Sequence, residues 1–293
     1  MSEINKKKGY ILLVTSTTLL YFMTVFVKLI TNRGNINGTE VSFFRFLIGF
    51  ILVNIGMLKN GYDIKMVNKK AVLLRAVFAS MSIISFFIVI QILSATKGNI
   101  YNLSYPIFVA LLGPLFLKDE SWSLKNIIGV VISFSGLLFI SGLAFGNFTS
   151  GDIAGILMGI ISSLGIIALR EARKTDKSST ILFYMFFVGL IITVICFGRT
   201  FRMPDTVEWF YIACMGIFSY LGQYTLASGF KHVNSVEGSL ISESRIFIAA
   251  IFGALFMGEI LTASTLFGGV LIFIGIVIVS LKKISLKKAE NIL

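Results

Sequence analysis

The sequence is poor in the residue types from which soluble enzymes build catalytic and metal sites. Its 293 residues include one histidine, two cysteines and only 14% charged residues. The single histidine, His232, argues against a histidine-based metal site, and Cys196 and Cys214 lie in apolar runs that indicate no disulfide framework. A soluble protein carries about 25% charged residues. This chain lacks the polar groups to cover a water-facing surface of its size, so a soluble two-domain protein is excluded.

Apolar sequence is abundant instead. Hydrophobic residues make up 56% of the chain, and the mean hydropathy is +0.90. The net charge of +12 would suit a nucleic-acid-binding protein, but such proteins gather their basic residues on a polar face. Here long apolar runs separate short charged ones. We therefore expect an all-α integral membrane protein that lies in a lipid bilayer and has no nucleic-acid partner.

A bilayer-spanning helix needs about 20 mostly apolar residues. Ten windows of this kind follow one another with short loops between them, which predicts ten transmembrane helices and leaves no room for a separate soluble domain. The expected spans are 9–30, 39–58, 71–93, 99–117, 124–143, 152–169, 180–197, 209–230, 239–256 and 262–281.

The distribution of lysine and arginine predicts the orientation. Most of the 26 basic residues fall at the two termini and in alternate loops, including the tail 282–293. The loops of the opposite side hold only Arg33, Lys97, Arg199 and Arg202. Because basic residues accumulate in cytoplasmic loops, we expect both termini to be cytoplasmic in a multi-pass plasma-membrane protein.

A segment of the first half recurs in the second half. Aligned without a gap, these positions match in pairs: Ala110 with Ala249, Glu120 with Glu259, Gly129 with Gly268, and Gly136 with Gly275. With five expected spans in each half, the second half must enter the membrane upside down relative to the first. Inverted repeats are typical of secondary transporters, which bind substrate between the halves near the midplane. We expect 9–143 and 151–281 to form two inverted five-helix repeats.

The doubled pattern resembles a known family. In each half, an apolar helix ends three residues before a glutamate, and the next helix has two spaced glycines, over 106–136 and 243–275. With the arginine-led segment 45–48, this is similar to the EamA family of the drug/metabolite transporter superfamily, over about residues 9–281. The resemblance implies a ten-helix carrier whose cavity is lined by the first, third and fourth helices of each half. It implies no particular substrate, because members move amino acids, nucleotide-like metabolites and vitamins.

Ionisable residues within spans are costly, so each is a candidate functional residue. Arg45 lies about 9 Å inside its span. A structural ion pair or a contact with a backbone carbonyl explains an arginine at this depth as well as contact with a substrate does. Glu243 and Arg245 point about 200° apart on a continuous helix, so we expect one to face the cavity and the other a neighbouring helix. The depth of Arg75 permits a pair with Glu243. We expect Arg45 and Glu243 to lie on opposite sides of the bilayer midplane and not to touch directly.

The fourth span carries several polar and aromatic candidates. Tyr101, Tyr105 and Phe108 share one face of a continuous helix. Pro106 would free the carbonyl of Asn102, and a free carbonyl near the midplane suits a binding site or a hinge. Aromatic packing around an ordinary membrane-helix proline is the simpler alternative.

Other polar residues give weaker signals. Gln223 and Tyr224 are candidates for substrate binding, but hydrogen bonds between helices explain them equally well. Gly155 and Gly159, like the paired glycines of the repeat, favour close helix packing over substrate contact. Glu120 is expected to act at a helix end more than in binding.

The favoured function is a secondary transporter that moves small organic metabolites across the plasma membrane by alternating access. Arg45, Glu243 and Arg245 together give a net positive interior, which favours an amino-acid-like, anionic or carboxylate-bearing substrate. A membrane-embedded enzyme, a channel and a non-transporting scaffold are the alternatives. An enzyme would need a nucleophile–base pair, a metal cluster or a phosphate loop, and the sequence offers none of these. We expect no cofactor and no metal, and a homodimer is left open.

Overall fold

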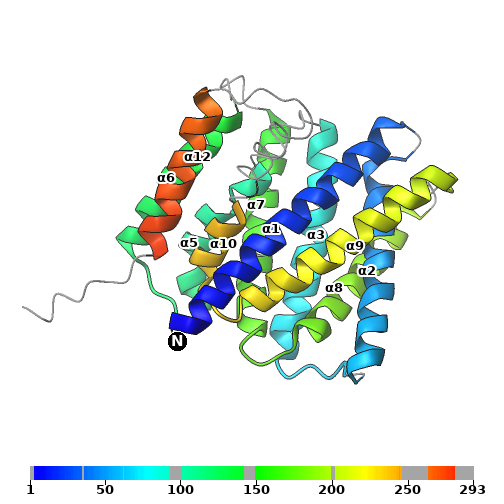
Figure 1. The fold of residues 1–293 in the computed structure, drawn as a ribbon, viewed down its shortest axis with the longest axis horizontal. Helices are drawn as coiled ribbons and strands as arrows, with labels where there is room; N and C mark the ends of the chain where they lie inside the picture. The colour runs from blue at the N-terminus through cyan, green and yellow to red at the C-terminus, as the bar shows by residue number, and fades with distance from the viewer. Residues whose placement is uncertain are drawn as a thin grey trace, which may run out of the picture.

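The structure is a computed structural model that describes residues 3–34, 36–61, 63–92, 101–141, 149–198, 202–243, 245 and 263–280. Regular structure in these residues is entirely α-helical. The helices of the first half are α1 (Glu3–Asn32), α2 (Gly38–Asn60), α3 (Lys69–Ile92), α5 (Tyr105–Phe116) and α6 (Leu124–Ser141). Those of the second half are α7 (Ser150–Ala172), α8 (Ser178–Phe197), α9 (Thr206–Gly229), α10 (Ser235–Glu243) and α12 (Ala263–Ser280) (Figure 1).

Each expected span overlaps one of these helices. Four helical stretches are long and apolar enough to cross a membrane: Asn5–Asn32, Gly38–Lys59, Ser150–Ala172 and Ser178–Cys196. Tyr101–Phe116, Leu124–Gly136 and Leu266–Val279 are shorter apolar helices. Large apolar side chains are exposed along them, among them Phe267 and Phe273 of α12. An apolar exterior of this extent is typical of a protein that lies in lipid. The expected residues Lys97, Arg199 and Glu259 and the tail 282–293 lie outside the described residues.

Carboxylates close the first turns of several helices. Asn37 accepts hydrogen bonds from the backbone N–H groups of Thr39 and Glu40, and Glu40 returns a bond from its carboxylate to the N–H of Asn37 at 2.8 Å. The same capping box joins Asp205 and Glu208 at the start of α9. These boxes satisfy N–H groups that have no partner within a helix. Several buried acids therefore serve helix starts and are not available to a binding site.

The fourth span differs from our expectation of one continuous helix. Residues 101–103 are helical, Ser104 forms a turn, and α5 begins at Tyr105. Pro106 therefore stands in the first turn of α5, where the missing N–H costs no helical hydrogen bond. It does not interrupt a helix at mid-length. The hydroxyl of Ser104 donates to the carbonyl of Tyr101 at 2.8 Å and closes the turn.

Helices of the first half pack mainly on helices of the second. α1 lies along α9 and α3 along α7, while α2 packs on α8, α5 on α10, and α6 on α12 (Figure 1). In the expected repeat, α1 would correspond to α7 and α3 to α9. Exchanging the halves therefore maps the α1–α9 pair onto the α7–α3 pair and leaves the α2–α8 and α6–α12 pairs unchanged.

Glycines bring the backbones of α6 and α12 into contact. Gly129 lies against Gly275, and Gly136 lies against Gly268, so the two helices run antiparallel. Between them the hydroxyl of Ser133 donates to the carbonyl of Ile272 at 3.2 Å. A Cβ atom at position 136 would overlap the carbonyl oxygen of Gly268. Close packing of small residues is a common way to join membrane helices.

This contact predicts that two glycine-to-alanine substitutions differ in their effect on the stability of the protein. Gly136→Ala should destabilise the protein by about 1–3 kcal/mol, because the added methyl group forces α6 and α12 apart. Gly165→Ala, within α7, is the control, since its Cβ would meet its nearest neighbour at 3.4 Å and alanine favours helix. Thermal unfolding in detergent should show a lower midpoint for Gly136→Ala alone. Equal midpoints for the two variants would contradict the packing of α6 on α12.

Candidate functional site

A cluster of basic and polar side chains lies inside the helix bundle. Arg45 projects from α2 and is only 8% exposed. Its Nε donates to the hydroxyl of Ser219, on α9, at 2.8 Å. The neighbours of Arg45 within α2 are apolar, so its side chain can reach polar partners only toward the interior of the bundle.

A second arginine approaches the same helix from α3. Arg75 is 5% exposed, and its Nη2 donates to Oε1 of Gln223, one turn along α9 from Ser219, at 3.2 Å. In the described part of the chain, the buried Nε of Arg75 has no hydrogen-bond partner. From its depth, we expected that Arg75 could pair with Glu243. The structure instead gives it a neutral amide partner.

Tyr105 and the end of α10 complete the cluster. The hydroxyl of Tyr105 donates to the carbonyl of Ser239 at 3.1 Å, and it lies close to Ser242. Glu243, at the end of α10, is 2% exposed, while Arg245 is half-buried. Both charges act on the Tyr105 hydroxyl. Arg245 is helical as well. Which of the two side chains faces the cavity stays a prediction.

Positive charge dominates this interior. Arg45 lies within electrostatic range of both Arg75 and Arg245. Among the described residues, no carboxylate oxygen lies within 4.0 Å of Arg45 or Arg75. The hydrogen-bond partners of these two arginines are a serine hydroxyl and a glutamine amide, both neutral. The cluster can therefore accept an anionic group without first breaking an ion pair among the described residues.

The structure brings together five of the eight candidate residues: Arg45, Tyr105, Gln223, Glu243 and Arg245. Ser219 is a polar partner that sequence reasoning missed. A serine one helical turn from Gln223 was the available signal, but serine is too common in membrane helices to stand out.

Tyr101 and Asn102 lie apart from this cluster. The hydroxyl of Tyr101 donates to Oδ1 of Asp152 on α7 at 2.9 Å, and the Tyr101 ring lies over Gly155. Asn102 is half-buried in the short helical segment before Ser104. Phe108 packs on Gly159, also on α7. Tyr101 and Phe108 therefore both pack on α7, whereas the hydroxyl of Tyr105 reaches α10, so the three side chains do not meet at one site.

Tyr224 also lies outside the cluster. It is 42% exposed, and its ring lies 6.2 Å from that of Tyr220, centroid to centroid. Both tyrosines line a separate pocket at one end of the bundle.

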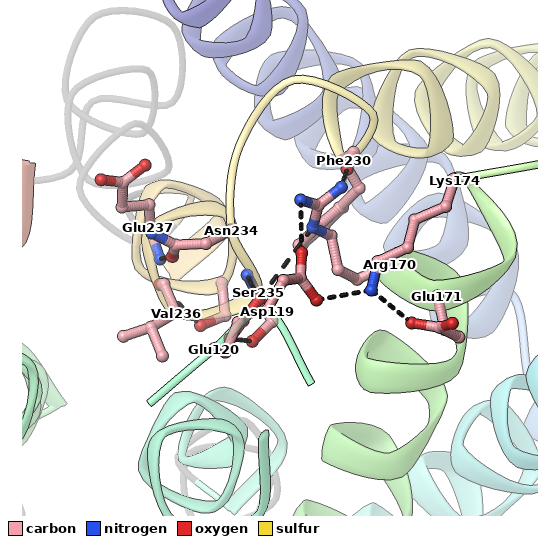
Figure 2. Close-up of polar contacts among 11 residues, drawn as sticks. Asp119, Glu120, Arg170, Glu171, Lys174, Phe230, Asn234, Ser235, Val236 and Glu237 are labelled. Carbon is pink, nitrogen blue, oxygen red and sulfur yellow. Dashed lines mark hydrogen bonds and ion pairs between the residues drawn. The ribbon is translucent and has the colours of Figure 1, made fainter. Parts of the chain in front are cut away.

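At one end of α5, a polar network joins the two halves of the chain (Figure 2). Oε1 of Glu120 accepts a hydrogen bond at 2.7 Å from the backbone N–H of Ser235, the first residue of α10. Oε2 accepts from the hydroxyl of the same serine. The expected helix-end role of Glu120 is therefore seen in the structure, although the helix it closes is α10 and not its own.

Basic residues of α7 extend this network. Nη1 of Arg170 donates to the carbonyl of Phe230 at 3.2 Å, and Nη2 lies 3.4 Å from a carboxylate oxygen of Asp119. Lys174 contacts Asp119 as well (Figure 2). Burial raises the pKa of Glu120 above its ordinary value, and the hydrogen bonds from Ser235 oppose that shift. Burial alone would raise the pKa of Asp119, but the hydrogen bond and charge of Lys174, a backbone hydrogen bond and the charge of Arg170 together lower it. The network thus fixes the ends of α5, α7 and α10 together.

An apolar helical exterior around a buried basic cluster defines an integral membrane protein with a polar interior. Two stretches of the chain, 7–142 and 149–281, match the model of the EamA-like transporter family. The chain therefore belongs to this family, and it is a multi-pass membrane transporter by family.

Named relatives agree with this assignment. The pseudopaline exporter CntI of Pseudomonas aeruginosa is 24% identical over 278 residues, which are 94% of this chain and 97% of that protein. An uncharacterized transporter of Helicobacter pylori is 30% identical over 200 residues, with 65% and 66% of the two chains covered. One crystal structure superposes with a TM-score of 0.81 at 14% identity, covering 94% of this chain and 96% of that one, and shows the same fold.

The Glu120 contact predicts a local effect on α10. Glu120→Ala should speed hydrogen exchange at the amide of Ser235 about tenfold, since loss of a helix cap costs about 1–2 kcal/mol. Glu171→Ala is the control, because Glu171 pairs with Lys174 on α7 and does not touch α10. Exchange measured by mass spectrometry on peptides that span the start of α10 should separate the two variants. Unchanged exchange at Ser235 in the Glu120 variant would show that this carboxylate does not hold α10.

Proposed function

We propose that the protein is a secondary transporter for small organic anions, such as carboxylate-bearing or amino-acid-like metabolites. The observation that carries the proposal is the interior cluster of Arg45, Arg75 and Arg245. Burying an arginine without a counter-charge is expensive, and the cost falls when an anion enters. A guanidinium also matches a carboxylate geometrically, with two parallel N–H donors. A bound anion would thus complete a site that the protein leaves basic.

The neutral partners of the cluster fit a transient ligand better than a structural ion pair. Ser219 and Gln223 orient the guanidinium groups of Arg45 and Arg75 without neutralising them. Tyr105 adds a hydroxyl beside Glu243 and Arg245. An amino acid carries both charges, and Glu243 beside the arginines would suit its ammonium group. A transporter must also release its substrate, which favours a site whose charges are not locked in permanent ion pairs.

We propose further that the chain forms ten spans as two inverted repeats, 9–143 and 151–281, that alternate in access around this cluster. The antiparallel contact of α6 with α12 supports the inversion. The helix pairs support it as well, because they stay the same when the two halves are exchanged. On this proposal, the contact of Glu120 with Ser235 closes one end of the route and opens once in each cycle.

The basic loops support a cytoplasmic position for both termini in the plasma membrane. The relative from Pseudomonas aeruginosa is named an exporter, which supports testing transport in both directions. A membrane enzyme and a non-transporting scaffold are the competing functions. Saturable flux in proteoliposomes, with counterflow of labelled substrate, would exclude both and also a channel.

Paired ligands test the charge of the substrate. We expect amino acids and other carboxylates to stabilise the purified protein against thermal unfolding, and the corresponding amides not to. Arg45→Gln should abolish the difference within each pair, because it removes a guanidinium from the cluster. Arg202→Gln is the control, since Arg202 is exposed and lies outside the cluster. Equal stabilisation by carboxylates and amides, or by purely cationic compounds, would contradict an anionic substrate.

A single added charge should compete with the substrate. Gln223→Glu places a carboxylate where the amide oxygen now accepts from Arg75 at 3.2 Å. We expect it to weaken binding of the stabilising carboxylate, measured by calorimetry, by about tenfold or more, equivalent to about 1.4 kcal/mol. Gln223→Met is the control, since it removes the hydrogen bond and adds no charge. If the Met variant loses as much affinity as the Glu variant, electrostatic competition is not the cause.

A further inference from the structure

A second polar cavity lies away from the arginine cluster. Its volume is about 580 Å³, and it is formed by the ends of α2, α7, α8 and α9 together with the loops between α2 and α3 and between α7 and α8. None of Arg45, Arg75, Tyr105 or Glu243 lines it. The cavity is therefore a separate site on the face of the bundle where these loops lie.

Positive charge also prevails in this cavity. Four basic residues line it, Arg173, Lys174, Lys177 and Lys231, against the two acids Asp63 and Asp176. Lys177 pairs with Asp63 at 2.8 Å, and Lys174 pairs with Asp119 and Glu171 outside the cavity. Lys231 is exposed and forms no ion pair with any described residue. The charge of Lys231 is thus available to a ligand in the cavity.

The carboxylate of Asp176 is held by backbone donors and forms no ion pair, among the described residues, with the basic residues of the cavity. Oδ1 accepts from the N–H of Val67 at 2.7 Å, and Oδ2 accepts from the N–H of Asn68 at 2.9 Å. Arg173, 8% exposed, donates through Nε to the carbonyl of Ala227 at 2.9 Å and through Nη1 to the carbonyl of Asp176. Both acceptors are neutral. The guanidinium of Arg173 is therefore fixed in direction, with no carboxylate oxygen of a described residue within 4.0 Å.

Residues of α2 and α9 also line the cavity, next to exposed apolar side chains of the same helices. Gly56 and Met57 of α2 line it, as do Tyr220 and Tyr224 of α9. Just beyond this rim, Ile55 and Leu58 on α2 and Leu221 on α9 are exposed. Tyr224 is exposed and Tyr220 half-buried, and tyrosines beside apolar residues are typical of the boundary between hydrocarbon and water. A ligand in this cavity would thus meet cations at one end and hydrocarbon at the other.

Hydroxyl and backbone donors add to the polar end. Ser178 and Ser228 line the cavity with their hydroxyls 3.0 Å apart. Ser178 and Ser179 form the first turn of α8, a 20-residue helix whose N-cap residue, Lys177, makes no side-chain capping bond. These donors reinforce the attraction of the basic residues for a phosphate group.

We propose that this cavity binds the headgroup of an anionic phospholipid, with its phosphate toward Arg173 and Lys231 and its acyl chains along α2 and α9. Charge, volume and the apolar rim together favour an amphiphile over a soluble anion. Basic pockets between membrane helices bind anionic lipid headgroups in this manner. The proposal is independent of the transported substrate, because the cavity shares no lining residue with the arginine cluster.

Native mass spectrometry of the full-length protein tests the site. The probes are phosphatidylglycerol and phosphatidylcholine with identical acyl chains, which differ in headgroup charge. We expect phosphatidylglycerol to bind more tightly and Lys231→Gln to weaken its binding about fivefold, since one basic residue beside an anionic lipid is worth about 1 kcal/mol. Lys118→Gln is the control, because Lys118 is also exposed but does not line the cavity.

Three results would overturn the proposal. Equal retention of the two lipids would show that headgroup charge is not recognised. Equal losses in the Lys231 and Lys118 variants would show that the attraction is spread over the surface and not centred on the cavity. Full competition by glycerol phosphate, at the concentration of the lipid, would assign the cavity to a soluble phosphate and not to a lipid.

Discussion

Guanidinium charge held inside a protein that itself lies in hydrocarbon is the constraint on which the rest of this structure depends. Arg45 and Arg75 are buried, and lipid offers no water to solvate them. Each must therefore find polar partners within the bundle, which ties α2 and α3 of the first half to α9 of the second. The same two contacts that make the arginines tolerable also join the halves, so the polar interior is part of the architecture and not an addition to it.

The acids explain why this interior stays basic. The chain has 14 acidic residues against 26 basic ones, and several of the acids are committed to helix starts. Glu40 and Glu208 close α2 and α9, Glu120 closes α10, and Asp176 accepts from the two backbone N–H groups just before α3. An acid that caps a helix stabilises positive partial charge at its N-terminus. Carboxylates thus stabilise helix ends, and Arg45 and Arg75 are left with the neutral partners Ser219 and Gln223.

Four helices of the structure are runs of about 20 apolar residues and could be predicted from hydropathy alone, since lipid demands such runs whatever the neighbours are. Arg45, Glu243 and Arg245 were predictable for the same reason: a charge within such a run is conspicuous. Arg75 was harder, since its place near a helix start made it look like a loop charge. The grouping predicted for Tyr101, Tyr105 and Phe108 holds only for Tyr101 and Phe108, which pack on α7, while Tyr105 reaches α10; spacing alone does not say which neighbour a side chain meets.

The contact of Glu120 with Ser235 shows a different limit. The repeat pointed to Glu120, but its partner is 115 residues away in sequence, on the other half of the chain. Residue pairs of this kind depend on how the halves dock, and neither hydropathy nor local spacing carries that information. The repeat identified a position that matters, and the structure was needed to show which helix it serves.

The glycine contact of α6 and α12 has the reciprocity of an isologous interface. Gly129 touches Gly275, the counterpart of Gly136, and Gly136 touches Gly268, the counterpart of Gly129, while Ser133 meets its own counterpart position at Ile272. Two identical subunits related by a two-fold axis would make this same pattern. A single five-helix chain could thus form the contact with a second copy of itself inserted the other way up. Fusing the copies into one chain frees each half to diverge, as the unequal residues at Ser133 and Ile272 already have.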